Sequence, residues 1–235
     1  MTTSSRSSAT LAQFTSLARN MTSGSFSAEY EFPSTKGSTA GSATLYVAQR
    51  LPAGTKTPVS MLGSEGEWIY RLTTEDGAVY ELLKNGGFVS DCWRGGPRKP
   101  FTCTGPGSLG NFGIALDIAV QLDVPGTAET EFQTSVLEAS KRPTLTTYRT
   151  DSRYGELSCL RATELDGMAF DWCLSATGRL VSQARPGSIG FPWTTIRLER
   201  LRNDVSTADF ELSGSPRGSF SVLPTMMLPP PAPPR

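Results

Sequence analysis

The sequence predicts an α+β protein built on a curved antiparallel β-sheet that helices cover only in part. Three observations predict it: many short segments alternate apolar and polar residues at period two, glycine-containing turns separate them, and helical spacing is confined to three segments. The alternation gives the sheet one dry face and one wet face. Because the strands outnumber the helical segments, we expect part of the dry face to remain free of helices.

The three helical segments lie at the start and in the middle of the chain. In the first, Thr10 and Gln13 have capping-box spacing, apolar residues recur every three or four positions as far as Met21, and Gly24 ends the pattern. The other two occupy residues 108 to about 121 and about 127 to 140. We expect the helices to cover the concave side of the sheet.

The strands are predicted from alternation and from the turns between them. Residues 26–32 (FSAEYEF) alternate strictly, so that Phe26 and Tyr30 share one side and the glutamates share the other. Asp76-Gly77 and Asn85-Gly86-Gly87 are typical of hairpins, because these residues accept positive φ. The predicted strands are residues 26–32, 43–50, 67–72, 78–84, 88–93, 144–149, 180–184 and 194–201, with a further hairpin within 158–175.

These elements predict a single domain and a monomer. The domain comprises residues 11–213, after a polar leader at 1–10 and before a tail at 214–235 that contains seven prolines and is expected to be extended or disordered. The leader lacks the basic, apolar and small-residue regions of a signal peptide, so we expect no export signal in this chain.

Composition narrows the possible functions. The chain has 22 Lys and Arg residues against 22 Asp and Glu residues, so no positive excess exists for binding nucleic acid. It has no histidine, the most common general base and zinc ligand. Residues 105–110 (GPGSLG) match a dinucleotide-binding pattern, but no βαβ unit follows them. We therefore expect no nucleic-acid partner, no metal, no cofactor and no enzymatic activity.

The four cysteines are spaced to form two short cross-strand disulfides. A hairpin that turns at residues 165–167 sets Cys159 directly opposite Cys173, and the same register across WRGGPRKPFT sets Cys92 opposite Cys103. Zinc binding is disfavoured because CxxC spacing and histidine are both absent, which leaves four free buried thiols as the alternative. Two disulfides indicate an oxidising compartment.

The hairpin register also gives residues 158–175 an aromatic side. Leu160 faces Trp172 and Ala162 faces Phe170, whereas the cysteines lie on the opposite, polar side. Two interpretations of the aromatic side remain open. It is either core covered by helices, or the wall of an apolar cavity for a lipid or another small molecule.

The order of the elements carries a resemblance to a known family. An N-terminal helix leads into GSFSAEYEF and ATLYVAQR, followed by a cysteine-stapled hairpin, central helices, DWCLSATGRLVSQA and the closing DVSTADFEL before the proline-rich tail. From Leu11 to Leu212 this order resembles the LolA/LppX/LprG-like superfamily of bacterial extracytoplasmic carriers. The resemblance implies a strongly curved antiparallel half-barrel with helices on its concave side.

The resemblance also implies a function. It predicts an extracytoplasmic carrier that holds a lipid, or the acyl chains of a lipoprotein, in the half-barrel. The alternative is an envelope sensory or interaction domain of the same fold that docks a partner protein without lipid. A basic loop with Arg94, Arg98 and Lys99 either contacts lipid headgroups or is simply solvated. The implied cavity lining is Phe26, Tyr30, Leu45, Val47, Trp68, Tyr70, Phe170 and Trp172.

Overall fold

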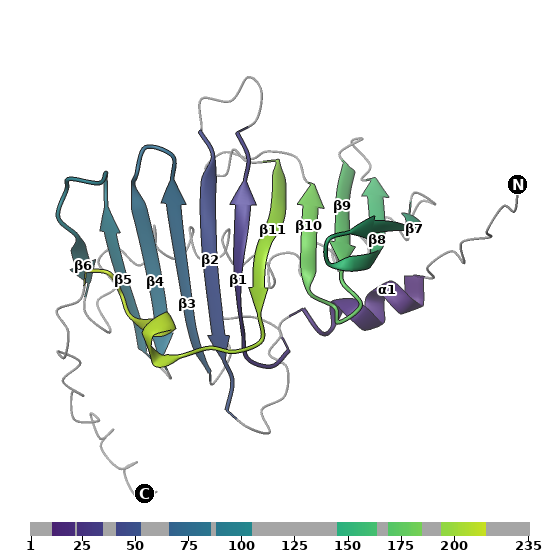
Figure 1. Ribbon diagram of the computed structural model, residues 1–235, viewed down its shortest axis with the longest axis horizontal. Coiled ribbons are helices and arrows are strands. Elements are labelled where there is room, and N and C mark those ends of the chain that lie inside the picture. Colours follow the sequence, from purple (N-terminus) through teal and green to yellow (C-terminus); the bar gives the residue numbers. More distant parts are fainter. Residues whose placement is uncertain are drawn as a thin grey trace, which may run out of the picture.

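Eleven β-strands form one antiparallel sheet that accounts for most of the described chain (Figure 1). The computed structural model describes residues 11–21, 23–34, 41–52, 66–85, 88–104, 145–163, 169–184 and 194–214. The elements are α1 (Leu11–Ala18), β1 (Phe26–Phe32), β2 (Ala43–Arg50), β3 (Glu67–Thr74), β4 (Val79–Asn85), β5 (Phe88–Arg94), β6 (Thr102–Thr104), β7 (Leu145–Ser152), β8 (Gly155–Thr163), β9 (Ala169–Leu174), β10 (Leu180–Ala184), β11 (Thr195–Arg202) and the 3₁₀-helix η1 (Thr207–Phe210).

The strand order shows how the two halves of the chain meet. Consecutive strands pair with each other except β6 and β7, which are the two edges, and at the centre β1 pairs with β11. The sheet therefore consists of two meanders, β1–β6 and β7–β11, joined along the β1–β11 seam (Figure 1). A register shift between Glu29 and Tyr30 interrupts this seam, as a β-bulge does.

The predicted strands are confirmed within the described residues. β1, β2 and β10 have the predicted bounds, and the other predicted strands differ by a few residues at their ends. The predicted hairpin within 158–175 forms β8 and β9, with Leu160 opposite Trp172 and Ala162 opposite Phe170. The two central helices, the polar leader and the tail beyond residue 214 lie outside the described residues.

The predicted fold class is wrong. The protein is mostly β rather than an α+β half-barrel with helices over its concave side, because within the described residues α1 is the only α-helix and has eight residues. The edge strands β6 and β7 do not pair with each other, so the sheet is open. The physical reason is the balance of the two patterns: period-two alternation continues through eleven paired strands, whereas the confirmed helical pattern lasts only two turns.

The two faces of the sheet differ in polarity. One face, called here the apolar face, carries Phe26, Tyr30, Leu45 and Tyr70, and most of its side chains belong to one buried cluster. The opposite face, called here the charged face, carries residues such as Arg200. A smaller cluster on the charged face joins Ala48, Ile69, Leu83 and Cys92 to Phe210 and Leu212 from the C-terminal segment.

The helix packs at one end of the sheet. Phe14 and Ala18 of α1 are buried, and the helix contacts β8 and β9. The C-terminal end of the helix rests on the turn between β9 and β10. In this turn Gly178 has a φ of 83°. A Cβ atom at Gly178 would lie 2.3 Å from the carbonyl oxygen of Leu17. Only glycine satisfies both the left-handed backbone and this close approach.

Candidate functional site

The eight residues proposed as a cavity lining all project from the apolar face. They come from β1, β2, β3 and β9, and seven of them have an exposed fraction of 1% or less, while Phe170 is half-buried. All eight belong to, or pack against, one cluster. The structure thus brings together the side chains that the sequence analysis selected.

Strand register explains how six of these side chains meet. Tyr30 on β1 pairs with Leu45 on β2, and Val47 on β2 pairs with Tyr70 on β3. Trp68 lies two positions from Tyr70 on the same face of β3. Side chains that face the same way on paired strands are in contact range, so these residues form a continuous apolar surface.

The other two lining residues lie on the far side of the seam. Phe170 and Trp172 of β9 stack with 5.6 Å between ring centroids and 10° between ring planes. β11 and β10 separate them from β1. Leu198 on β11 and Leu180 on β10 are buried in the same cluster, so the apolar surface continues across the seam.

A group of polar contacts made by Tyr30 and Arg179, called here the polar end, lies beside this surface next to the seam. Tyr30 donates a hydrogen bond to the carbonyl oxygen of Leu180 at 3.3 Å. Burial raises the pKa of the Tyr30 phenol above its ordinary value, although the nearby Arg179 opposes the shift. Tyr30 is therefore a neutral donor that fixes β1 relative to β10.

Arg179 is the buried cation of this polar end. Its guanidinium donates to the carbonyl oxygens of Asn20 at 3.3 Å, Met21 at 2.7 Å and Ser23. It also lies 4.0 Å above the ring centroid of Phe26. Burial lowers the pKa of Arg179 from its ordinary value. These contacts tie the segment after α1 to the sheet, a known use of arginine at helix C-termini.

Three further polar residues on the apolar face are buried. Gln49 donates to the carbonyl oxygen of Gly24 at 2.7 Å, and Gln183 lies opposite Trp172. Lys84 lies opposite Trp68, and burial lowers the pKa of its ammonium group. The face is thus apolar in the middle and carries hydrogen-bonding groups along its strand ends and at β10.

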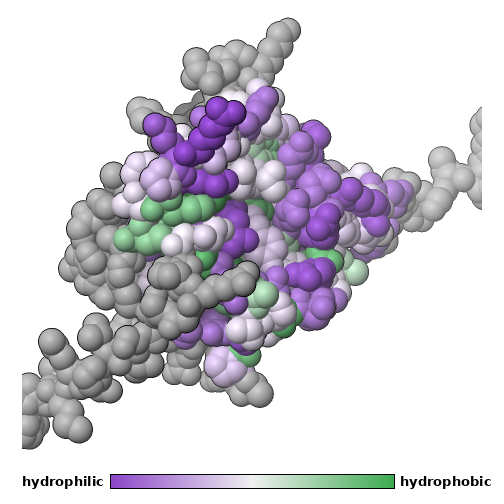
Figure 2. All heavy atoms as spheres, turned by 60° about the vertical axis from the view of Figure 1, so that its left-hand side comes forward, coloured by the Kyte–Doolittle hydropathy of each residue, from purple (hydrophilic) through white to green (hydrophobic). Residues whose placement is uncertain are grey.

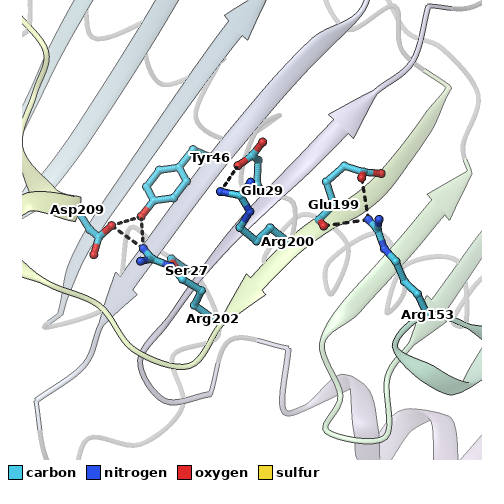
Figure 3. Close-up of polar contacts among 8 residues, drawn as sticks. All are labelled: Ser27, Glu29, Tyr46, Arg153, Glu199, Arg200, Arg202 and Asp209. Atoms are coloured by element: carbon cyan, nitrogen blue, oxygen red, sulfur yellow. Dashed lines mark hydrogen bonds and ion pairs between the residues drawn. The ribbon is translucent and has the colours of Figure 1, made fainter.

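Beside its smaller apolar cluster, the charged face carries a series of ion pairs (Figure 3). Arg200 on β11 lies 3.9 Å from the carboxylate of Glu29 on β1, across the seam. Arg153 in the β7–β8 turn reaches β11, where it pairs with the Glu199 carboxylate at 2.7 Å and donates to the Leu198 carbonyl at 2.8 Å. The turn between β7 and β8 is thereby fastened to the centre of the sheet.

A C-terminal strap, defined as Val205–Gly214, lies on the charged face over the β1–β6 meander (Figure 1). Asp209 accepts hydrogen bonds from the Tyr46 hydroxyl at 2.5 Å and from Arg202 at 2.8 Å (Figure 3). It also accepts from the backbone and the hydroxyl of Ser206. Burial opposes ionisation, but these donors prevail and lower the pKa of Asp209 to about 2.

The far end of the strap is held by a second carboxylate. Glu81 on β4 is buried, pairs with Arg71, and accepts hydrogen bonds from the backbone nitrogen of Ser213 at 2.7 Å and from its hydroxyl at 2.5 Å. Arg71 donates in turn to the carbonyl of Glu211 at 2.9 Å. The strap is therefore fixed at both ends.

Both predicted disulfides are present. Cys92 bonds to Cys103 between β5 and β6, and Cys159 bonds to Cys173 between β8 and β9. Tyr148 lies beside the second disulfide, and burial together with the Asp171 carboxylate raises its pKa to about 12. The two disulfides indicate an oxidising, extracytoplasmic environment.

No protein-family model matches the chain. The comparison with curated proteins also finds no match. Within the described ranges, no set of three or more acidic, cysteine or histidine side chains is arranged to hold a metal ion. Among the same residues, no helix has the length and apolarity to cross a membrane.

Sequence reasoning missed part of the apolar face. Two of the missed residues could have been included from the sequence. Alternation places Phe32 on the same side as Phe26 and Tyr30, and the hairpin register places Leu160 beside Trp172. The burial of four polar residues of this face, Gln49, Lys84, Arg179 and Gln183, could not be predicted from the sequence, because it depends on which strands pair in the sheet. The buried apolar side chains beyond the eight include Phe14, Met21, Phe32, Leu72, Leu160, Leu174, Leu180, Ile196 and Leu198.

Proposed function

We propose that this protein is a lipid-binding carrier of an extracytoplasmic compartment that holds acyl chains against the apolar face. The observation that carries the proposal is the single buried cluster to which the apolar face contributes from Trp68 on β3, across the seam, to Phe170 on β9. Five strand spacings separate β3 from β9, which is about 24 Å. One leaflet of a bilayer is about 15 Å of hydrocarbon, so an acyl chain fits within that width.

The coverage of the face determines what a bound lipid has to displace. Among the described residues, the α-helix contacts β8 and β9, at one end of the sheet, while the aromatic surface extends to β3. Seven of the eight lining residues are already buried, so a lipid must replace whatever covers them. Transfer of an acyl chain from water contributes about 0.8 kcal/mol per methylene, which is enough to offset its immobilisation.

Native mass spectrometry tests this function directly. We expect protein purified without detergent to carry lipid adducts, and delipidated protein to bind a fluorescent fatty acid with a rise in thermal stability. Phe170→Glu, at the one half-buried lining position, should weaken fatty-acid binding at least tenfold. The matched control is Arg197→Glu, which places the same carboxylate on the exposed charged face and should leave binding unchanged.

The alternative function is a ligand-free sensory or interaction domain of the envelope. It predicts the opposite results. If the apolar face is permanently filled by the protein itself, purified protein carries no lipid, fatty acid does not stabilise it, and Phe170→Glu affects only folding. That set of results would remove the carrier function and leave the interaction domain.

A further inference from the structure

The loop between β5 and β6 combines an exposed aromatic residue with exposed basic residues. Trp93, at the end of β5, has an exposed fraction of 44%, the largest of any large apolar side chain in the described part of the chain. Arg98 and Lys99 follow in the loop and are exposed. We call Trp93 and residues 94–101 the basic tip. Figure 2 turns this end of the sheet toward the viewer, and hydrophilic side chains gather there above a band of hydrophobic ones.

Arg98 and Lys99 of the basic tip differ from several other basic residues of the described chain in having no ion pair. Several arginines on the charged face are paired with carboxylates, as in Arg200 with Glu29 and Arg202 with Asp209. Arg98 and Lys99 have neither an ion pair nor a side-chain hydrogen bond within the described residues. No carboxylate of the described ranges therefore pairs with their positive charge, and both side chains are exposed.

Two carboxylates beside the tip do not pair with it. They belong to the β3–β4 turn, which the tip touches where Pro97 packs against Gly77. Glu75 accepts hydrogen bonds from Ser42, and Asp76 accepts from the backbone nitrogen of Ala78. Both carboxylates are thus engaged within or beside their own turn.

The tip is also held in place. The Cys92–Cys103 disulfide closes its base, and the guanidinium of Arg94 lies 4.9 Å above the ring centroid of Phe101. The contact between Pro97 and Gly77 supports its side. A fixed, protruding loop loses little conformational freedom when it meets a surface.

We propose that the basic tip docks on a bilayer that carries anionic lipid headgroups. Tryptophan favours the membrane interface, and each Lys or Arg near an anionic surface strengthens binding about fivefold. The inference rests on the proposed carrier function, because a carrier of acyl chains must load and unload at a membrane. The tip supplies the docking contact, and the apolar face supplies the lipid site.

Vesicle co-sedimentation tests the docking contact. The intact protein should bind vesicles of phosphatidylglycerol and phosphatidylcholine, bind pure phosphatidylcholine weakly, and lose binding in 0.5 M salt, where charges are screened within about 4 Å. Arg98→Gln combined with Lys99→Gln should weaken binding to the anionic vesicles about 30-fold. The control, Arg19→Gln combined with Arg197→Gln, removes the same charge from two other exposed positions and should bind like the unmodified protein.

Tryptophan fluorescence gives a second measurement that does not depend on net charge. The chain has four tryptophans, so the measurement uses Trp193→Phe as its background. Anionic vesicles should shift the emission of this variant to shorter wavelength, and adding Trp93→Phe should abolish the shift, because Trp68 and Trp172 are already buried. Equal binding by the tip and control variants, or equal binding to both kinds of vesicle, overturns the proposal. Lipid adducts measured in parallel report on the carrier function alone, so a protein that carries lipid but ignores vesicles contradicts only the docking site.

Discussion

At the scale of the residue, Arg179 connects the helix to the sheet. Its guanidinium satisfies three carbonyl groups in the segment after α1 and lies against the ring of Phe26. No carboxylate among the described residues pairs with it. A cation buried in this way is stabilised by carbonyl dipoles and by the aromatic face instead of by a counter-ion.

Removing this cation should destabilise the protein despite the relief of its burial. Arg179→Met keeps the length of the side chain but removes the guanidinium donor of the Met21 and Ser23 carbonyls, while the Asn20 carbonyl keeps its hydrogen bonds from Ser23. We expect a loss of about 3 kcal/mol in the free energy of unfolding, measured by urea denaturation. Arg197→Met, at an exposed position, should change it by less than 0.5 kcal/mol, as is usual for surface sites. A loss below 1 kcal/mol for Arg179→Met would mean that other contacts hold this segment.

Two glycines allow backbone strain to be separated from packing. Gly178 and Gly155 have similar positive φ values of 83° and 88°, but a Cβ would meet the Leu17 carbonyl oxygen only at Gly178 and nothing within 4 Å at Gly155. Gly155→Ala should therefore cost only the strain of about 1–2 kcal/mol. Gly178→Ala should cost at least twice as much and speed hydrogen exchange in α1, because the helix must move away. Equal costs in thermal denaturation would contradict the proposed role of the turn in docking the helix.

At the scale of the element, the C-terminal strap is held at its first half by the side chain of Asp209 and at its far end by Glu81. Asp209 joins the strap to β2 and β11 through Tyr46 and Arg202, while Phe210 and Leu212 bury the apolar cluster beneath. Because the pKa of Asp209 is lowered in the folded state, folding favours the ionised carboxylate. This stabilisation is fully present at pH values above the pKa of the carboxyl in the unfolded chain, which is near 4. It is lost as the pH falls through the folded pKa of about 2.

Asp209→Asn should remove this pH-dependent contribution to stability. The substitution should cost about 2 kcal/mol at pH 7, through the loss of charge-assisted hydrogen bonds. The difference from the unmodified protein should narrow as the pH falls from 5 to 2, because the carboxylate of the unfolded chain binds a proton below about pH 4 whereas the native one does so only near pH 2. Asp204→Asn, an exposed neighbour, serves as the control and should show no such convergence. Urea titrations at several pH values measure both variants, and a difference that stays constant with pH would contradict the assignment.

The elements also show what a sequence pattern reveals and what it hides. Alternation in FSAEYEF and the turn at residues 165–167 are local signals, so β1 and the Cys159–Cys173 pairing were predictable. The strap was not, because Asp209 finds Tyr46 163 positions away and no local period encodes that contact. The α+β prediction failed for a related reason, since helical spacing alone gave no measure of how many strands would join one sheet.

At the scale of the whole molecule, the seam determines how the two meanders depend on each other. β1 and β11 are the first and last strands of the described residues, and their pairing turns two sequential meanders into one sheet. The buried cluster crosses the seam and contains Leu45 from the first meander and Leu174 from the second. Neither meander can bury its apolar face without the other, so the sheet should unfold as a unit.

Substitutions on either side of the seam should therefore affect the same transition. Leu45→Ala and Leu174→Ala each empty a position that is fully buried and should cost about 2–5 kcal/mol. In calorimetry and near-ultraviolet circular dichroism, each variant should show one transition shifted to lower temperature, with the two methods in agreement. Thr73→Ala, at an exposed site on β3, should leave the transition in place. If Leu45→Ala split the transition in two and moved only one part, the meanders would be separate folding units, and the apolar surface on which the lipid site depends would not be continuous.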